Sequence, residues 1–331
     1  MVTIKDVAKA AGVSISTVSN ALNNMSNVGE DTRQRILEIA NQMNYVPNLN
    51  ARRMKNHVSN TVGLFLPNVQ SSFYVMLIRA IHECCRERKF SLIVHISNSY
   101  TSEKLSSTIL SANIDGAIIL DEHLKNEESR LLESRTMPLV FLDKHLCAEN
   151  ISSVLIDNEM GCEQAMDFLV RSGHKRIAYI RGSDNYDGQV RYDSYRRLMT
   201  RYQLPVDERW VLNGNFQEKV AYPLVAQTLS LMPGRLPDAF LCANDAMAIG
   251  CIRALHEAGY RVPEDVSVFG FDDGDEGKYC DPKLTTIHVP VTEMGQKAVR
   301  ELFRLMQPYE TGAVTLQETR LVVRESCTFR R

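Results

Sequence analysis

The chain has 331 residues, of which 44% are hydrophobic, and a formal net charge of −2. This length predicts two or three domains, and the apolar fraction is ordinary for a globular protein with full cores. The polar N-terminus lacks the features of a signal peptide and no apolar run is long enough to span a membrane, so we expect a cytoplasmic protein with no membrane partner. The eight cysteines include no C-x-x-C pair, which predicts neither a zinc site nor a disulfide framework.

The segment VTIKDVAKAAGVSISTVSNALNN, which begins at Val2, predicts two short helices joined by a tight turn. Thr3 and Asp6 have the spacing of a capping box, and Gly12 supplies the permissive backbone that a sharp turn needs. Ser14 is placed to cap the second helix. Helical spacing predicts that the inward-facing residues are Val7, Ala10, Ala11, Val18, Ala21 and Leu22.

The outward face of the second helix carries short side chains, most of them able to form hydrogen bonds. They stand at the N-terminal end of a helix slim enough to enter the major groove of DNA. This pattern predicts a helix-turn-helix that reads DNA, and the alternative is an ordinary helical hairpin. The DNA contacts expected from this motif are Thr3, Ser14, Ile15, Ser16, Thr17, Ser19 and Asn20.

The charge distribution agrees with a DNA-binding module at the N-terminus. Residues 1–58 carry seven Lys and Arg against four Asp and Glu, whereas the rest of the chain carries 31 against 36. Attraction to phosphate should therefore belong to the N-terminal module. A third helix is predicted over residues 30–44, with Ile36, Ala40 and Met43 at core spacing.

From residue 61 the pattern changes to short apolar runs that alternate with helical stretches. Continuous apolar strands separated by helices predict parallel sheets covered on both faces, and the region is long enough for two such lobes. The runs are TVGLFLP, FSLIVHIS, GAIIL, PLVFLD, SVLID, RIAYIRG, DAFLCAN, VSVFGFDD and TTIHVP.

The string TIKDVAKAAGVS…TVS…LN at the N-terminus closely resembles the LacI/GalR family of bacterial transcriptional regulators. Further matching strings are GHKRIAYIRG (173–182), CANDAMAIG (242–250), VPEDVSVFGFDD (262–273), PKLTTIHVP (282–290) and RLVVRESC (320–327). The resemblance implies a small all-α helix-turn-helix headpiece followed by a two-lobed α/β domain like the periplasmic binding proteins. The implied boundaries are a DNA-binding domain at 1–46, a hinge at 47–59 and an effector domain at 60–331, with one lobe at about 60–158 and 288–318 and the other at about 159–287 and 319–331.

The basic segment after the third helix is a hinge helix if the resemblance holds. Such a hinge folds on DNA, pairs with its twin in a dimer and inserts an apolar wedge into the minor groove. Met54 aligns with the wedge, and Arg52, Arg53 and Lys55 would meet phosphates or the groove edge. The alternative is an ordinary basic linker.

Small ligands bind open α/β folds at the carboxyl ends of strands, here in a cleft between the lobes. The resemblance implies that Asp272 accepts hydrogen bonds from the ligand and that Arg191, in RYDSY, clamps it from the opposite side, with Ser194 in place of the usual Gly. The other expected contacts are the aromatic residues Phe73, Tyr74 and Phe216 and the polar residues Asp143, Lys144, Asn244 and Asp245. This mixture suits a sugar or a sugar derivative, although Asp245 alone could simply cap the helix that follows it.

We therefore expect a repressor that binds a pseudo-palindromic DNA operator as a homodimer and responds to a small molecule, and the sequence leaves open whether that molecule releases or strengthens DNA binding. A dimer is favoured because the chain lacks the leucine-rich tail by which the lactose repressor forms tetramers. The alternative, a sugar receptor without DNA function, is disfavoured by the helix-turn-helix. No motif for nucleotide phosphates, zinc proteolysis or a serine nucleophile occurs, so we expect no catalytic residue, no metal and no cofactor.

Overall fold

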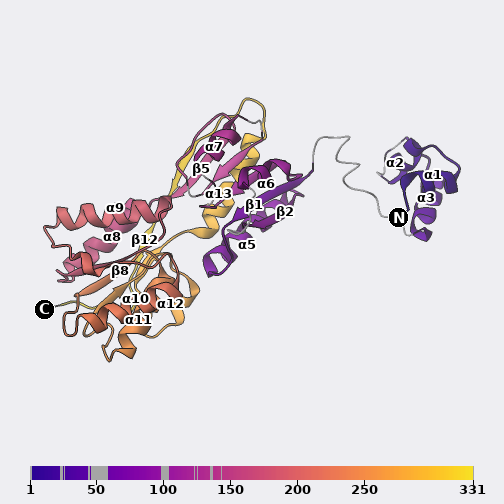
Figure 1. The fold of residues 1–331 in the computed structure, drawn as a ribbon. Coiled ribbons are helices and arrows are strands. Elements are labelled where there is room, and N and C mark those ends of the chain that lie inside the picture. Colours follow the sequence, from indigo (N-terminus) through magenta and orange to yellow (C-terminus); the bar gives the residue numbers. More distant parts are fainter. Residues whose placement is uncertain are drawn as a thin grey trace. The chain divides into compact units, whose positions relative to one another are not determined.

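The computed structural model describes residues 2–22, 25, 27–43, 45, 59–97, 104–122, 124, 126–134, 137–142 and 144–330. The chain forms two compact units, Met1–Ser59 and Asn60–Arg331, and each is described by itself (Figure 1). Within the described residues, no helix combines the length and apolar character that crossing a membrane requires.

The first unit contains three helices, α1 (Ile4–Ala11), α2 (Ile15–Leu22) and α3 (Glu30–Gln42). The predicted capping box is confirmed, because the Asp6 carboxylate accepts hydrogen bonds from the Thr3 amide at 2.9 Å and from its hydroxyl at 2.7 Å. The predicted turn is confirmed as well, since Gly12 ends α1 with a φ of 65° that other residues rarely adopt.

The three helices enclose one small core. Its buried members are Val7, Ala8, Ala11, Val18, Ala21, Val28, Ile36 and Ala40. The prediction that Ala10 faces inward is wrong, and Ala8 is buried instead, because α1 packs against both α2 and α3. Met43 is only half-buried, and α3 ends at Gln42 instead of continuing to residue 44.

The first lobe of the second unit is built on a six-stranded sheet in the order β11-β5-β4-β3-β1-β2, in which every pair is parallel. Its strands are β1 (Thr61–Leu66), β2 (Ser91–Ile96), β3 (Gly116–Ile119), β4 (Leu139–Phe141), β5 (Ile151–Ile156) and β11 (Val314–Gln317). Its helices are α5 (Ser72–Glu87), α6 (Leu105–Ser111), α7 (Asn126–Glu133) and α13 (Val291–Leu305). Alternation along β1 sends Leu64 to one core and Phe65 to a second one on the opposite face, so both faces of the sheet are covered.

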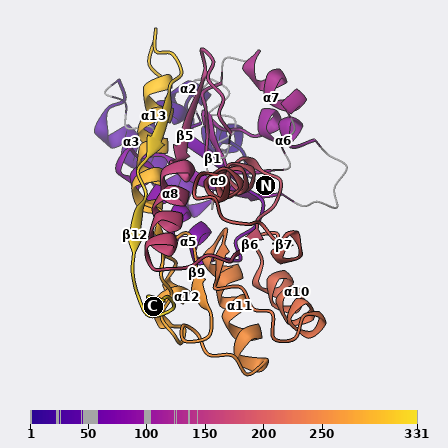
Figure 2. The same cartoon turned by 90° about the vertical axis from the view of Figure 1, so that its left-hand side faces the viewer.

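The second lobe is built on a four-stranded parallel sheet in the order β7-β6-β8-β9. Its strands are β6 (Ile177–Arg181), β7 (Val211–Asn213), β8 (Ala239–Cys242) and β9 (Ser267–Phe269). Its helices are α8 (Asn158–Arg171), α9 (Tyr186–Arg201), α10 (Glu218–Leu231), α11 (Asp245–Glu257) and α12 (Asp275–Tyr279), with a short 3₁₀ turn η1 (Glu208–Trp210). Helices α10, α11 and α12 gather at one end of the unit, away from α6 and α7 (Figures 1 and 2).

The chain passes between the two lobes after β5, after β10 (Thr286–His288) and before β12 (Arg320–Val322). Strands β10 and β12 pair with each other in the antiparallel direction. The expectation that the TTIHVP run joins a parallel sheet is confirmed only in part. Thr285 and His288 form isolated parallel bridges with Phe269 and Asp272, whereas the continuous pairing of this run is the antiparallel one with β12. The apolar-run analysis also missed β7, β11 and β12, which are short and only partly buried.

Candidate DNA-reading face and ligand cavity

The first turn of α2 is held in shape by its own hydroxyl groups. The Ser14 hydroxyl accepts a hydrogen bond from the Thr17 amide at 3.1 Å, which confirms the predicted N-cap. The same hydroxyl is hydrogen-bonded to the hydroxyls of Ser16 at 2.7 Å and Thr17 at 2.8 Å. The helix is anchored from the other side by Val18 and Ala21, which are buried in the core of the unit.

The predicted contact residues lie on the solvent side of this motif. Ile15 leaves 45% of its surface exposed, although it is a large apolar residue next to an available core. Thr3, Ser14 and Ser16 are exposed, and Thr17, Ser19 and Asn20 are half-buried. Such a face can enter a groove of DNA without unfolding the unit. The predicted hinge contacts Arg52, Arg53, Met54 and Lys55 lie outside the described residues, as does Asp143.

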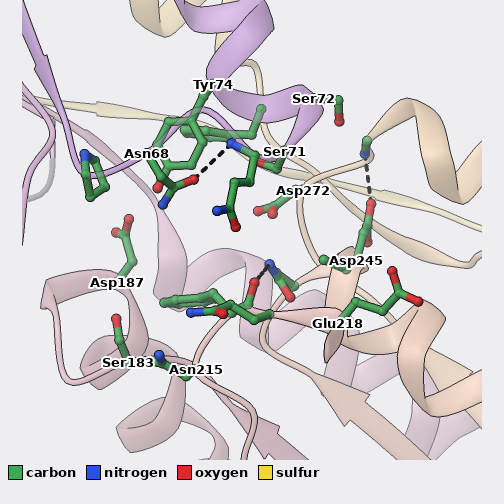
Figure 3. Close-up of a pocket in the computed structure, with 18 of the residues that line it drawn as sticks. Asn68, Ser71, Ser72, Tyr74, Ser183, Asp187, Asn215, Glu218, Asp245 and Asp272 are labelled. Atoms are coloured by element: carbon green, nitrogen blue, oxygen red, sulfur yellow. Dashed lines mark hydrogen bonds between the residues drawn. The ribbon is translucent and has the colours of Figure 1, made fainter. Parts of the chain in front are cut away.

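The second unit contains a cavity of about 430 Å³ between its two lobes (Figure 3). Of the predicted ligand contacts, those that line this cavity are Phe73, Tyr74, Arg191, Phe216, Asn244, Asp245 and Asp272. They come from loops and helix starts that follow β1, β6, β7, β8 and β9, at the carboxyl ends of the parallel strands. Lys144 does not line the cavity, because its ammonium group donates to the Leu124 carbonyl and, at 3.4 Å, to the Ser129 hydroxyl.

Arg191 is a buried cation whose position is fixed on several sides. Its Nε donates to Asn158 Oδ1 at 2.7 Å, and its Nη1 donates to the Ala243 carbonyl at 2.6 Å and to Asp272 Oδ1 at 3.4 Å. The guanidinium also lies over the Phe271 ring, 3.7 Å from the ring centroid. Arg191 therefore presents its charge from a rigid position at the floor of the cavity.

Asp187 was not predicted, yet it lines the same cavity. Its Oδ1 accepts a hydrogen bond at 2.7 Å from the amide of Asn158, whose oxygen binds Arg191. The available signal was its spacing: Asp187 lies four residues before Arg191 on α9, which puts both side chains on one face of the helix. A chain of contacts thus runs from Asp187 through Asn158 and Arg191 to Asp272.

Asp272 is aimed into the cavity by the connection between the lobes. Its φ of 119° is a conformation that residues with a Cβ rarely adopt, and such strain is found where the surroundings impose it. Its amide donates to the Ile287 carbonyl at 2.8 Å, and its carbonyl accepts from the Val289 amide at 3.2 Å. The backbone that holds Asp272 is therefore the segment around β10, which leads from one lobe to the other.

The two carboxylates that flank Arg191 hold their protons more tightly than ordinary aspartates. Burial raises the pKa of Asp272 to about 7, and repulsion from Asp187 adds to this while Arg191 opposes it. Burial also raises the pKa of Asp187, against the lowering effect of Arg191 and of the hydrogen bond from Asn158. Both groups lack full solvation in the cavity, which a ligand offering hydrogen-bond donors would restore.

Asn244 and Asp245 serve the architecture of the cavity wall. Asn244, not Asp245, caps α11 by accepting from the Met247 amide at 3.0 Å, and its Nδ2 donates to the Phe216 carbonyl at 3.2 Å. Both oxygens of Asp245 accept hydrogen bonds, at 2.6 Å from the Thr286 hydroxyl and at 2.8 Å from the Gly274 amide. These two residues position the loops that carry Phe216 and Asp272.

The Phe216 ring reaches the cavity through a gap that only glycine leaves open. A Cβ on Gly182 would lie 2.1 Å from Phe216 Cζ. In the described residues, no group of three or more His, Cys, Asp or Glu side chains is arranged to hold a metal ion. The cavity combines aromatic rings with hydrogen-bonding side chains, an arrangement that suits a small polar ligand.

Two sequence families match the chain. Residues 3–48 match the bacterial regulatory proteins of the lacI family, and residues 166–327 match the periplasmic binding protein-like domain. The repressor PurR of Haemophilus influenzae is 32% identical over 94% of this chain and 93% of its own length. The probable repressor ExuR of Bacillus subtilis is 32% identical over 98% of both chains.

Solved structures agree with this assignment. The lac repressor dimer bound to operator and the anti-inducer ONPF is 28% identical, with a TM-score of 0.84 over 99% of both chains. The regulator CelR in complex with cellobiose is also 28% identical, with a TM-score of 0.73 over 98% of this chain and 100% of its own. These matches confirm the predicted fold class of a helix-turn-helix headpiece followed by a two-lobed α/β domain. The chain belongs to the LacI family of bacterial transcriptional regulators.

Proposed function

We propose that this chain is a sequence-specific repressor that binds a pseudo-palindromic operator as a homodimer, and that a sugar or sugar derivative bound between the lobes changes its operator affinity. The observation that carries the proposal is the exposed first turn of α2, where Ile15 and the hydroxyls of Ser14 and Ser16 face solvent. The relatives are named as transcriptional repressors, so we assign the chain no catalytic role. A repressor acts where the chromosome is, which in a bacterium is the cytoplasm.

The cavity supports the response to a small molecule. Aromatic rings from both lobes, Phe73 and Tyr74 on one and Phe216 on the other, suit the apolar faces of a sugar, and the carboxylates suit its hydroxyls. The lobes are also hydrogen-bonded across the cavity, from Ser72 to Glu276 at 2.6 Å and from Ser183 to Glu122 at 2.8 Å. A ligand that contacts both lobes can therefore shift the balance between two lobe arrangements, and the family resemblance links this balance to a hinge at 47–59.

The reading face is tested by replacing Asn20 with alanine. We expect the preferred operator to bind more weakly by about 1–3 kcal/mol, with relaxed preference at one base pair, because a side chain in the groove distinguishes bases by hydrogen bonds. The operator is first selected from random duplex DNA with the unchanged full-length chain, and the affinity of both proteins is then measured for each single-base variant.

Asn41→Ala is the matched control, since Asn41 is an exposed asparagine that belongs to α3 and not to α2. This control should bind and select DNA as the unchanged protein does. If the Asn20→Ala protein kept the same preferred DNA sequence and the same affinity, the assignment of α2 as the DNA-reading helix would be wrong.

The dimer is proposed to form over the edge of the six-stranded sheet. Strand β2 lies at that edge and leaves Ile93 52%, Val94 36% and Ile96 47% exposed. An apolar edge strand left open to solvent promotes association, and a second copy of the chain would cover it. The lac repressor structure with the TM-score of 0.84 is that of a dimer, which supports a dimer here.

Ile93→Asp is expected to raise the dimer dissociation constant at least tenfold, about 1.4 kcal/mol, because a charge would be placed in an apolar contact. Sedimentation velocity over a concentration series measures the change. Leu231→Asp is the control: Leu231 is 73% exposed at the end of α10 in the other lobe. Equal dissociation constants for the two variants would place the dimer contact elsewhere.

A further inference from the structure

The charged side chains that line the cavity are mostly acidic. The acidic ones are Glu122, Asp187, Glu218, Asp245, Asp272, Asp273 and Glu276, and the basic ones are Arg191 and Lys219. Asp273 forms an ion pair with Arg324 and is hydrogen-bonded to His288, and neither partner lines the cavity. Glu276 and Glu122 accept hydrogen bonds from the uncharged hydroxyls of serines, which leaves their charges in place.

Arg191 is the buried cation among these residues, and its charge is already opposed. Its donors are directed to the Asn158 side chain, the Ala243 carbonyl and Asp272. Asp187 and Asp272 lie on either side of the cavity, so two acidic side chains face the single guanidinium of Arg191 (Figure 3). Lys219 is exposed at the start of α10, directly after the exposed Glu218.

Helix starts attract anions, and several helices begin at this cavity, so their amides need to be accounted for. At α9 and α11 the chain fills these positions itself, whereas the starts of α5 and α10, which also line the cavity, carry no side-chain cap. Asn185 accepts from the Gly188 amide at the start of α9, and Asn244 does the same for α11. Asp187 and Asp245 stand in the first turns of these two helices and place their carboxyl oxygens where an incoming anion would otherwise find positive potential.

We infer that the cavity selects a neutral or positively charged polyhydroxylated ligand, such as a plain sugar or an amino sugar, and rejects sugars that carry a phosphate or a carboxylate. Hydroxyl and ammonium groups donate hydrogen bonds to Asp187 and Asp272 and replace the solvation that burial removes. A phosphate or carboxylate would instead add a negative charge beside two carboxylates and one shared guanidinium. The inference rests on the proposed ligand-binding function and narrows its ligand class.

The first test compares ligands that differ in charge. Glucose, galactose, ribose and cellobiose are titrated into the full-length protein, together with glucosamine, galactosamine, glucuronate, galacturonate and glucose phosphate, and heat of binding and thermal shift are recorded. We expect binding within the neutral and amino sugars, and at least tenfold weaker binding of the uronate or phosphate counterpart of the best one.

Two results overturn the inference: an anionic sugar that binds as tightly as its neutral counterpart, or no binding by any neutral or amino sugar. Operator binding is measured on the same sample without ligand. It shows separately whether the proposed DNA-binding function stands when the charge selectivity fails.

The second test removes the charge and keeps the shape. Asp187→Asn and Asp272→Asn are each expected to reduce the discrimination against the anionic counterpart at least threefold, because asparagine is nearly isosteric and uncharged. Asp193→Asn is the control, since Asp193 lies on α9 with Asp187 but is exposed and does not line the cavity. Circular dichroism verifies folding, and either folded variant suffices. If the variants at Asp187 and Asp272 discriminated between neutral and anionic sugars as strongly as Asp193→Asn does, these two carboxylates would not determine which ligand charge the cavity accepts.

Discussion

Replacing Arg191 with alanine is expected to destabilise the second unit by about 3–5 kcal/mol, because removal of one partner leaves buried charges without compensation. Arg191 is 3% exposed. Its loss would leave Asp272 without its positive neighbour and the Asn158 oxygen and the Ala243 carbonyl without their donors. Denaturant unfolding of the unchanged and variant proteins measures the difference, and binding of any sugar identified above should be lost as well.

The effect of Arg191→Ala should grow with pH. The pKa of Asp272 is about 7 in the folded protein and 3.8 as its ordinary value, so the folded state keeps a proton that the unfolded chain releases. A group of this kind contributes stability at low pH, and that contribution is lost as the pH rises through the folded pKa. Without Arg191 the pKa of Asp272 rises further, so we expect a larger loss at about pH 8 than at about pH 5.

Arg197→Ala is the matched control for this prediction. Arg197 lies on the same helix, but its side chain is 48% exposed and pairs with Glu159 and Glu163 at the surface. Such pairs contribute at most about 1 kcal/mol. If Arg191→Ala were no more destabilising than Arg197→Ala, the guanidinium would not be the group that holds the cavity floor together.

Ile36→Ala is expected to abolish operator binding by unfolding the first unit. Ile36 is fully buried in a core whose other members are alanines and valines, and removal of such a side chain costs about 2–5 kcal/mol. A unit of this size is stable by only a few kcal/mol, at roughly 0.05–0.15 kcal/mol per residue. Sugar binding should be unaffected, because the cavity belongs to the second unit.

Leu37→Ala is the control, since Leu37 is half-buried on α3 and lies outside the core of the first unit. Its operator affinity should stay close to that of the unchanged protein. Thermal unfolding followed by circular dichroism is expected to show a separate transition for each unit, so that the unfolding of the first unit can be measured by itself. Operator affinity of Ile36→Ala within about twofold of the unchanged protein would contradict the view that this small core holds the reading helix in place.

The sequence by itself determined the features that depend on neighbouring residues. The capping of α1 by Thr3 and Asp6, the turn at Gly12 and the Ser14 cap are all local, and each is where spacing predicts it. Most strands of the two parallel sheets came from apolar runs, because a strand buried on both faces must be apolar along its length, whereas the short and only partly buried β7 and β11 did not. Since ligand sites lie at the carboxyl ends of such strands, the order of runs also placed Asp272 at the cavity, whereas Arg191 was expected there from the family resemblance.

Only the tertiary structure decided which of these side chains are available and which are already engaged. Lys144 ends a predicted strand but turns away from the cavity, and both oxygens of Asp245 bind groups about 30 and 40 residues further along the chain. Asp187 acquires its position through Asn158, which lies 29 residues before it. The pairing of β10 with β12 likewise joins distant segments. Local spacing carries no information on such partners, because burial and hydrogen bonding between distant residues arise only when the lobes pack.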